Sequence, residues 1–559
     1  MENEKRVSVE ENVPTEKKKL NSKIKMPLIE TALYVGLFFV TMLLFFLLKP
    51  HITLLRKGAV AQTFIAIGIG LCGAFIAYMG ITKRLTARHV IVILLLVGVI
   101  IRLGYMLYTP AAARQHDTYT KNMDGHEAYA WTIFETGNLP ATNKYQFYHP
   151  PLNAMIQASF MRFTSWLTDG LTSLFGLGEY FPTQFLYSKP DYIAEERYFL
   201  YQTCQILSVM YSFLAAVFMV KIVGLFNFSK KVKLFLSAFV VLFPRQIQFA
   251  AMLNNDGLSY LLAILALYFA LKWQKGNKHW GWILACALAV GFGMMAKLSS
   301  ATVCLPIAGI FIYEFVCTLR KKEGSMKLSK MIFQYGAFLV LCAPIGLWFQ
   351  VYAMIRFDQG FGFVFSNLNK KLYTGDHSFF SRFFIAFDLK EYLGTLYCKP
   401  FSGNYNLFNY ALRSSIFGEF SYWQGEGFAA ASILFGGISA LLLTASLVWS
   451  IAAYFRKRKK GENLLEKSRQ SFSDLLFIGL LVASQVFSEI YFYIKMPYAC
   501  TMDFRYIMPL ILGMALQLGA TGKILTADGG KGAIALKRIT LVSVAMFIAV
   551  ATAFYCVCI

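Results

Sequence analysis

Apolar runs of about 20 residues, each long enough to cross a bilayer as a helix, recur along most of this 559-residue chain. The composition agrees, because 57% of the residues are hydrophobic and 15% are charged, whereas a soluble domain has about 25% charged residues. A soluble enzyme, a secreted disulfide scaffold and a disordered chain are therefore excluded. The sequence predicts an all-α polytopic membrane protein.

Hydropathy windows predict about 13 transmembrane helices. The first follows a basic tail, and no small-residue cleavage site follows it, which indicates a retained anchor and a cytoplasmic amino terminus. The expected spans are residues 28–48, 60–81, 89–109, 199–224, 234–252, 257–273, 280–297, 301–319, 331–353, 428–454, 475–494, 506–522 and 539–558.

Basic residues outnumber acidic ones, 54 to 30, and give a net charge of +24. In a soluble protein this excess would suggest nucleic acid, but here the basic residues occupy short gaps between apolar runs, as in cytoplasmic loops. We therefore expect a multi-pass protein of the cell membrane with no nucleic-acid partner. The alternation of basic loops places two long polar loops, residues 110–198 and 354–427, outside the cytoplasm. Of the cysteines, only Cys398 and Cys500 fall in long polar connections, so no disulfide framework or zinc spacing follows.

These loops divide the chain into six segments. They are a basic cytoplasmic tail (1–26), three transmembrane helices (27–109), an extracytoplasmic loop with juxtamembrane helices (110–198), a six-helix transmembrane segment (199–353), a second, aromatic-rich extracytoplasmic loop (354–427) and four carboxyl-terminal transmembrane helices (428–559).

The first long loop concentrates ionisable residues directly after the third span, in the sequence RQHDTYTKNMDGHEAYAWTIFETGNLPATNKYQFYHPPL (114–152). Asp117 falls just beyond the membrane surface, where nearby hydrocarbon would raise the proton affinity of its carboxylate and suit it to act as a general base. A solvated loop aspartate fits the sequence equally well.

Asp124 and Glu127 have the spacing of a helix capping box, which would explain both residues without chemistry. The helix that they would cap is expected to end at Gly137. His126 is then a surface or packing histidine, or a substrate ligand. His149 precedes two prolines that form a stiff turn leading into a second surface helix, and the prolines leave the histidine itself unexplained.

Single basic residues lie at the outer ends of later spans. Lys297 and Arg505 occupy such ends, and Arg245 lies in the outer part of the fifth span. They suit a phosphate group, although snorkelling to lipid headgroups explains such residues equally well. Arg102 and Glu489 lie well inside expected spans, where ionisable residues are costly and usually paired or functional.

Taken together, these residues resemble the bacterial GT-C glycosyltransferases of the glycosyltransferase 39 type, kin of protein O-mannosyltransferases and lipid A aminoarabinose transferases. The resemblance rests on Asp117, the Tyr-His-Pro-Pro-Leu turn at 148–152 and weaker downstream matches. Those matches are Pro244, Asn255-Asp256, Ala296-Lys297 and Arg505-Tyr506 with Pro509.

The resemblance implies a transferase that takes a sugar from a polyprenyl-phosphate donor and passes it to an extracytoplasmic acceptor, with inversion. Asp117 or Asp124 would be the catalytic base, and Lys297, Arg505 and Arg245 would hold the donor phosphate. Substrate contacts would come from His126, Glu127, His149 and Asp256. The chain departs from the family in its two extra early spans and in having Asp124-Gly125 where many relatives have Asp-Glu. The base is therefore open, and Asp117 is preferred because no capping role explains it.

No cofactor or metal is expected, because the chain lacks a nucleotide-binding glycine motif and a cage of oxygen ligands. A transporter or flippase of a lipid-linked or small polar solute is the alternative, with Arg102 and Glu489 as midplane groups. The absence of visible internal repeats weighs against it. A polymerase or ligase that transfers a whole glycan would look the same in sequence.

Overall fold

The computed structural model describes residues 57–111, 113, 115, 117–175, 189–322, 324–363, 372–384, 404–419, 426–459 and 469–557. Within these ranges the regular structure is helical, apart from one isolated bridge between Tyr373 and Tyr498. The prediction of an all-α protein is confirmed. The basic tail (1–26) and the first expected span (28–48) lie outside the described residues.

Ten described helices are long and apolar enough to cross a membrane, and each matches one expected span. They are α2 (Lys57–Ile81), α3 (Ala87–Tyr108), α6 with α7 (Glu195–Thr203 and Gln205–Leu225), α10 (Asp256–Lys275), η4 with α12 (Leu298–Val303 and Cys304–Leu319), α13 (Leu328–Phe357), α17 (Glu426–Lys459), α18 (Arg469–Lys495), α19 (Leu510–Asp528) and α20 (Lys531–Val557).

Two expected spans take a different form in the structure. The span at 280–297 is the shorter apolar helix α11 (Trp280–Ala296). The span at 234–252 is broken into α8 (Lys230–Leu242) and α9 (Pro244–Phe249), so an unbroken helix there was a wrong prediction. The reason is Pro244, which lacks an N–H and pushes Phe243 out of helical geometry, to φ −59° and ψ 125°.

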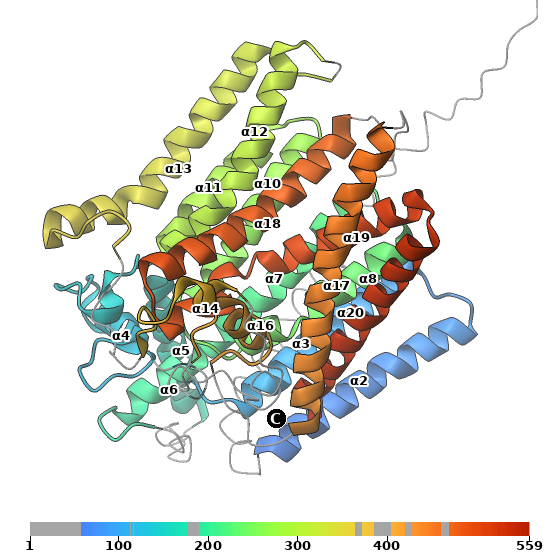
Figure 1. Ribbon diagram of the computed structural model, residues 1–559. Helices are drawn as coiled ribbons and strands as arrows, with labels where there is room; N and C mark the ends of the chain where they lie inside the picture. The colour runs from blue at the N-terminus through green and yellow to red at the C-terminus, as the bar shows by residue number, and fades with distance from the viewer. Residues whose placement is uncertain are drawn as a thin grey trace, which may run out of the picture. The chain divides into compact units, whose positions relative to one another are not determined.

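Helices that pack together include both consecutive helices and helices separated in the sequence. Helix α10 packs against α7 and α11, α11 packs against α13, and α17 packs against α20. Figure 1 shows α4 (His126–Thr136), α5 (Leu152–Phe175) and α6 gathered toward one end of the long helices. The first long loop is therefore folded against the helix ends.

Local sequence signals set the helices of this loop. Helix α4 ends at Gly137, which takes the left-handed conformation at φ 71°, as expected for a glycine at a helix carboxyl end. After the short helix η2 (Tyr145–Tyr148), the two prolines lead into α5. Helix α5 exposes Phe163 and Trp166, in keeping with a surface helix.

Candidate active site

The start of α4 differs from the predicted capping box. The N-cap is Gly125 and no side chain caps the helix. Asp124 lies one residue too early to cap, and its carboxylate accepts a hydrogen bond of 2.6 Å from the Thr120 hydroxyl. Glu127 forms an ion pair with Arg197 instead of reaching back to the cap. The capping-box prediction was wrong.

Backbone carbonyls cap α4 instead. The N–H groups of His126 and Glu127 donate to the carbonyl oxygens of Asp117 and Thr118, at 3.0 and 3.1 Å. A Cβ at Gly125 would lie 2.5 Å from the Thr118 oxygen and 2.9 Å from the Asp117 oxygen, so this close approach requires glycine. The glycine after Asp124 is thus explained by the way α4 holds the backbone of Asp117.

Asp117 points its carboxylate at His126 and Gln146. Its Oδ2 lies 3.4 Å from Nε2 of His126 and accepts a hydrogen bond of 3.3 Å from the Gln146 amide, while Oδ1 is buried without a hydrogen-bond partner among the described residues. Burial alone would raise the pKa of Asp117, but His126 and Arg505 more than offset it and hold the pKa well below its ordinary value. The expected rise in proton affinity was wrong, because the sequence did not show that His126 and Arg505 would lie close to this carboxylate.

His149 stacks beside His126, with ring centroids 6.0 Å apart and planes 8° from parallel. Burial, then the charge of Lys297 and the neighbouring His126, lowers the pKa of His149 well below its ordinary value. His149 is therefore neutral near pH 7 and is able to accept a hydrogen bond. Its backbone is fixed by the Tyr129 hydroxyl, which donates to the His149 carbonyl at 3.1 Å.

The cations lie beside Tyr506. Lys297, at the end of α11, places Nζ 2.5 Å from Oδ1 of Asp256 and 4.9 Å from the Tyr506 ring centroid. Arg505, in the short helix η7 (Phe504–Ile507), donates to the Tyr506 hydroxyl at 3.1 Å, and its Nε lies 3.6 Å from Asp503. Two positive groups therefore border the same aromatic ring.

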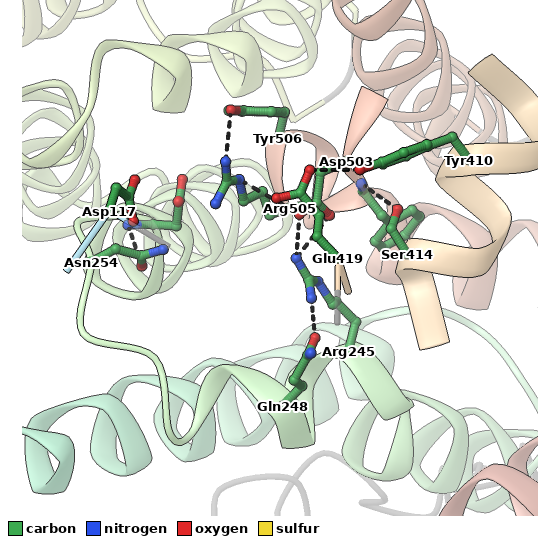
Figure 2. Close-up of polar contacts among 12 residues, drawn as sticks. Asp117, Arg245, Gln248, Asn254, Tyr410, Ser414, Glu419, Asp503, Arg505 and Tyr506 are labelled. Atoms are coloured by element: carbon green, nitrogen blue, oxygen red, sulfur yellow. Dashed lines mark hydrogen bonds and ion pairs between the residues drawn. The ribbon is translucent and has the colours of Figure 1, made fainter. Parts of the chain in front are cut away.

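Arg245 supports this arrangement from behind. Its Nη2 contacts both carboxylate oxygens of Asp503, at 2.8 and 2.7 Å, and its Nη1 donates to Gln248. Figure 2 shows Asp503 between Arg245 and Arg505. Gly418, at φ 64°, approaches so closely that a Cβ there would lie 1.9 Å from Arg245 Nη1. Arg245 is thus enclosed and its charge is balanced by Asp503.

A cavity of about 540 Å³ joins these groups. Six of the expected site residues line it, namely Asp117, His126, His149, Asp256, Lys297 and Arg505. Asp124, Glu127 and Arg245 do not line it. The sequence analysis missed further lining residues, which include Tyr145, Gln146, Thr302, Glu419 and Phe492, and it named the lining residues Tyr148 and Tyr506 only within motifs.

Glu419 is the most informative of the missed residues. It follows α16 (Leu407–Phe417), accepts a hydrogen bond of 2.7 Å from the Tyr410 hydroxyl and lines the cavity. Burial, only partly offset by Arg505, raises the pKa of Glu419 to about 7. Nothing in the sequence set Glu419 apart from the other acidic residues of the second long loop, which include Asp358, Asp376 and Glu426.

The two intramembrane charges do not pair with each other. Arg102 donates from Nε to the Ser212 hydroxyl at 2.8 Å and from its terminal nitrogens to the carbonyl oxygens of Gly98 and Val241, at 2.9 and 3.0 Å. These bonds tie α3 to α7 and to the broken end of α8. Glu489, on α18, lines the cavity. The described residues hold no group of three or more His, Cys, Asp or Glu side chains placed to bind a metal ion.

Comparison with known proteins gives a match to one family model, and the solved structures that match include two crystal structures of one protein. Residues 193–348 match the family model described as dolichyl-phosphate-mannose-protein mannosyltransferase. No curated protein matches the chain significantly. Crystal structures of ArnT from Cupriavidus metallidurans, one bound to undecaprenyl phosphate and one in the apo state, have TM-scores of 0.31 and 0.32. Their identities are 14% and 12%, over 78% of this chain and 77% and 76% of theirs.

The matched segment runs from α6 into α13 and includes Arg245, Asp256 and Lys297. Two of these three residues line the cavity. The family match confirms the resemblance to GT-C glycosyltransferases that the sequence motifs indicated, and supports a membrane-bound glycosyltransferase as the class of enzyme.

Proposed function

We propose that this protein transfers a sugar from a polyprenyl-phosphate carrier to an acceptor hydroxyl, with inversion and with Asp117 as the general base. One observation carries the proposal: a single cavity is lined by the Asp117 carboxylate and by two cations, Lys297 and Arg505. The name of the matched family supports a lipid-phosphate sugar as the donor. The basic loops favour a site on the extracytoplasmic side.

In the proposed reaction, the carboxylate and the two cations of the cavity have different roles. The acceptor oxygen attacks the anomeric carbon, a new C–O bond forms, and the proton passes to the Asp117 carboxylate. The bond from the anomeric carbon to the phosphate oxygen breaks, and its electrons leave with the polyprenyl phosphate. Lys297 and Arg505 stabilise the charge that develops on this phosphate, which is where fixed positive groups contribute most to the rate.

The geometry favours Asp117 over Asp124. Asp117 lines the cavity and keeps one carboxylate oxygen without a partner among the described residues, whereas Asp124 is engaged by Thr120 and lies outside the cavity. A low pKa makes Asp117 a weaker base in the ground state but keeps it ionised and ready at neutral pH. Asp124 instead organises the loop, because its carbonyl accepts the N–H of Gln146 at 3.2 Å.

The proposal is tested by transfer of radiolabelled sugar from a panel of polyprenyl-phosphate monosaccharides in membranes that contain the wild type, Asp117→Asn or Asp124→Asn at equal amounts. Loss of a general base lowers transfer by about 100- to 10,000-fold, so Asp117→Asn should fall by this factor. Asp124→Asn should change transfer far less.

Asp191→Asn is the matched control, since Asp191 is an exposed carboxylate of the same loop. Full transfer by Asp117→Asn would disprove its role as base. Absence of transfer by the wild type with every donor in the panel would overturn the proposed function itself.

A further inference from the structure

Glu489 carries a buried carboxyl group for which the described residues supply no hydrogen-bond partner. Its side chain is 3% exposed, it lines the cavity, and neither carboxylate oxygen has a hydrogen-bond partner among the residues that the structure describes. It lies on α18, within a candidate membrane span. A buried polar group without a partner destabilises the fold, so its presence requires a reason.

The positive groups of the described residues do not supply the partner. Arg102 is engaged by Ser212 and by backbone carbonyls. Arg505 lines the same cavity as Glu489, but it donates a hydrogen bond to the Tyr506 hydroxyl and forms an ion pair with Asp503. The protein therefore keeps this carboxyl group open to the cavity.

The wall around Glu489 has the composition of a carbohydrate site. Ser488 and Phe492 of α18 line the same cavity, and so does Thr302 from the facing helix η4. Gln485, one turn before Glu489, donates to the Thr302 hydroxyl at 3.2 Å and so joins the two helices. Hydroxyl, carboxyl and aromatic groups on one wall match the hydroxyl groups and apolar faces of a sugar ring.

The position of Glu489 suits contact with the donor sugar and does not suit the role of the base that deprotonates the acceptor. Phe492 contacts Tyr506 edge to face, with ring centroids 5.1 Å apart, and Tyr506 is the ring beside Lys297 and Arg505. A phosphate held by these two cations would carry its sugar next to the wall formed by α18. Asp117, in contrast, belongs to the first long loop and not to α18.

We propose that Glu489 binds hydroxyl groups of the donor sugar, and that it is a specificity-determining residue which discriminates the sugar-loaded carrier from the bare polyprenyl phosphate. This inference rests on the proposed function and extends it by naming the residues that would contact the sugar of the donor. Thr302, Ser488 and Phe492 complete the same subsite.

The test compares binding of two lipids to the purified full-length protein in detergent. The probes are a polyprenyl-phosphate monosaccharide, chosen from the mannosyl, glucosyl and arabinosyl forms as the one that the wild type binds most tightly, and the same polyprenyl phosphate without sugar. Glu489→Ala should weaken binding of the sugar-loaded lipid by about tenfold, the loss expected for hydrogen bonds to a buried acidic group. Binding of the bare lipid should not change.

Two further variants separate recognition from structural support. Glu489→Gln keeps the shape and some hydrogen-bonding capacity, so its loss should be smaller than that of Glu489→Ala. Tyr491→Phe, on the exposed face of the same helix, is the control and should bind both lipids as the wild type does. Without donor, the melting temperature of Glu489→Ala should equal or exceed that of the wild type, because the substitution removes an unpartnered buried group.

The outcomes are distinguishable. If Glu489→Ala weakens both lipids equally, or neither, or melts well below the wild type without donor, the assignment of Glu489 is overturned while the proposed function stands. If the wild type binds neither lipid, the proposed function fails and takes this inference with it.

Discussion

Helix α10 carries ion pairs at both ends, and the two ends differ in what surrounds them. At its amino end Asp256 pairs with Lys297, and both side chains line the cavity. At its carboxyl end Lys275 pairs with Asp474 of α18, and the nearby Lys278 lies 3.2 Å from Glu314 of α12. Neither of these two lysines lines the cavity.

An ion pair therefore does not by itself mark a ligand-binding site. The pairs at the carboxyl end hold α10, α12 and α18 together. At the amino end the pair lines a cavity that also receives carboxyl oxygens of Asp117 and Glu489 for which the described part of the chain supplies no hydrogen-bond partner. Groups left without partners in a cavity are what distinguish a place prepared for a ligand.

The largest difference between the two ends of α10 is expected when the lysine of each ion pair is replaced in turn. Lys297→Met should lower sugar transfer by about 100- to 1,000-fold, the loss expected when one group that stabilises the leaving charge is removed. Lys275→Met should leave transfer per folded molecule unchanged and instead lower the melting temperature, because the partly buried Asp474 loses its partner. Equal loss of transfer from both variants would contradict a functional difference between the two ends.

Gly125→Ala tests whether backbone capping of α4 positions the base. A Cβ there collides with the carbonyl oxygens of Thr118 and Asp117 and shifts the loop. A displacement of about 1 Å at a reacting group costs about 100-fold in rate, so transfer should fall toward that factor. Gly170→Ala, on α5 with nothing within 4 Å of the new Cβ, is the control. Wild-type transfer by Gly125→Ala would show that the base tolerates this movement.

The pH dependence of transfer sharpens the role of His126. A low pKa keeps Asp117 ionised as the pH falls, so the wild type should retain base function at pH 5. His126→Asn removes the main group that opposes the effect of burial, so the pKa of Asp117 should rise and the acid limb should move to higher pH. The ratio of transfer rates at pH 5 and pH 7.5 should then be lower in the variant. An identical ratio in both proteins would argue against this coupling.

The smallest effect is expected from Glu419→Gln. With a pKa raised to about 7 by burial, Glu419 binds a proton in the folded state that the unfolded state releases above about pH 4.5. The free energy of unfolding therefore falls as the pH rises from about 5 through 7, by on the order of 3 kcal/mol at most. Melting temperatures measured from pH 5 to pH 8 should decline less in Glu419→Gln than in the wild type. A parallel decline in both would assign the pH dependence to other groups.

Much of the site could be predicted because its residues stand at positions with a local meaning. Asp117, Lys297 and Arg505 each follow or end an apolar run, and the structure brings all three to one cavity. Glu127 was expected from a capping box and Arg245 from its place in the outer part of a span, but both form ion pairs: Glu127 pairs with Arg197, and Arg245 pairs with Asp503, 258 positions along the chain. No spacing rule reveals partners so distant in sequence.

The sequence alone determined the membrane architecture, because the free energy of placing a helix in a bilayer is a sum over its own residues. Ten of the expected spans follow from that sum. Tertiary structure decided which of Asp117 and Asp124 lines the cavity, why Gly125 follows Asp124, and that Glu419 and Glu489 line the same cavity. These outcomes depend on which groups from distant helices share a cavity, and proton affinity and hydrogen bonding are set by those neighbours and not by position in the chain.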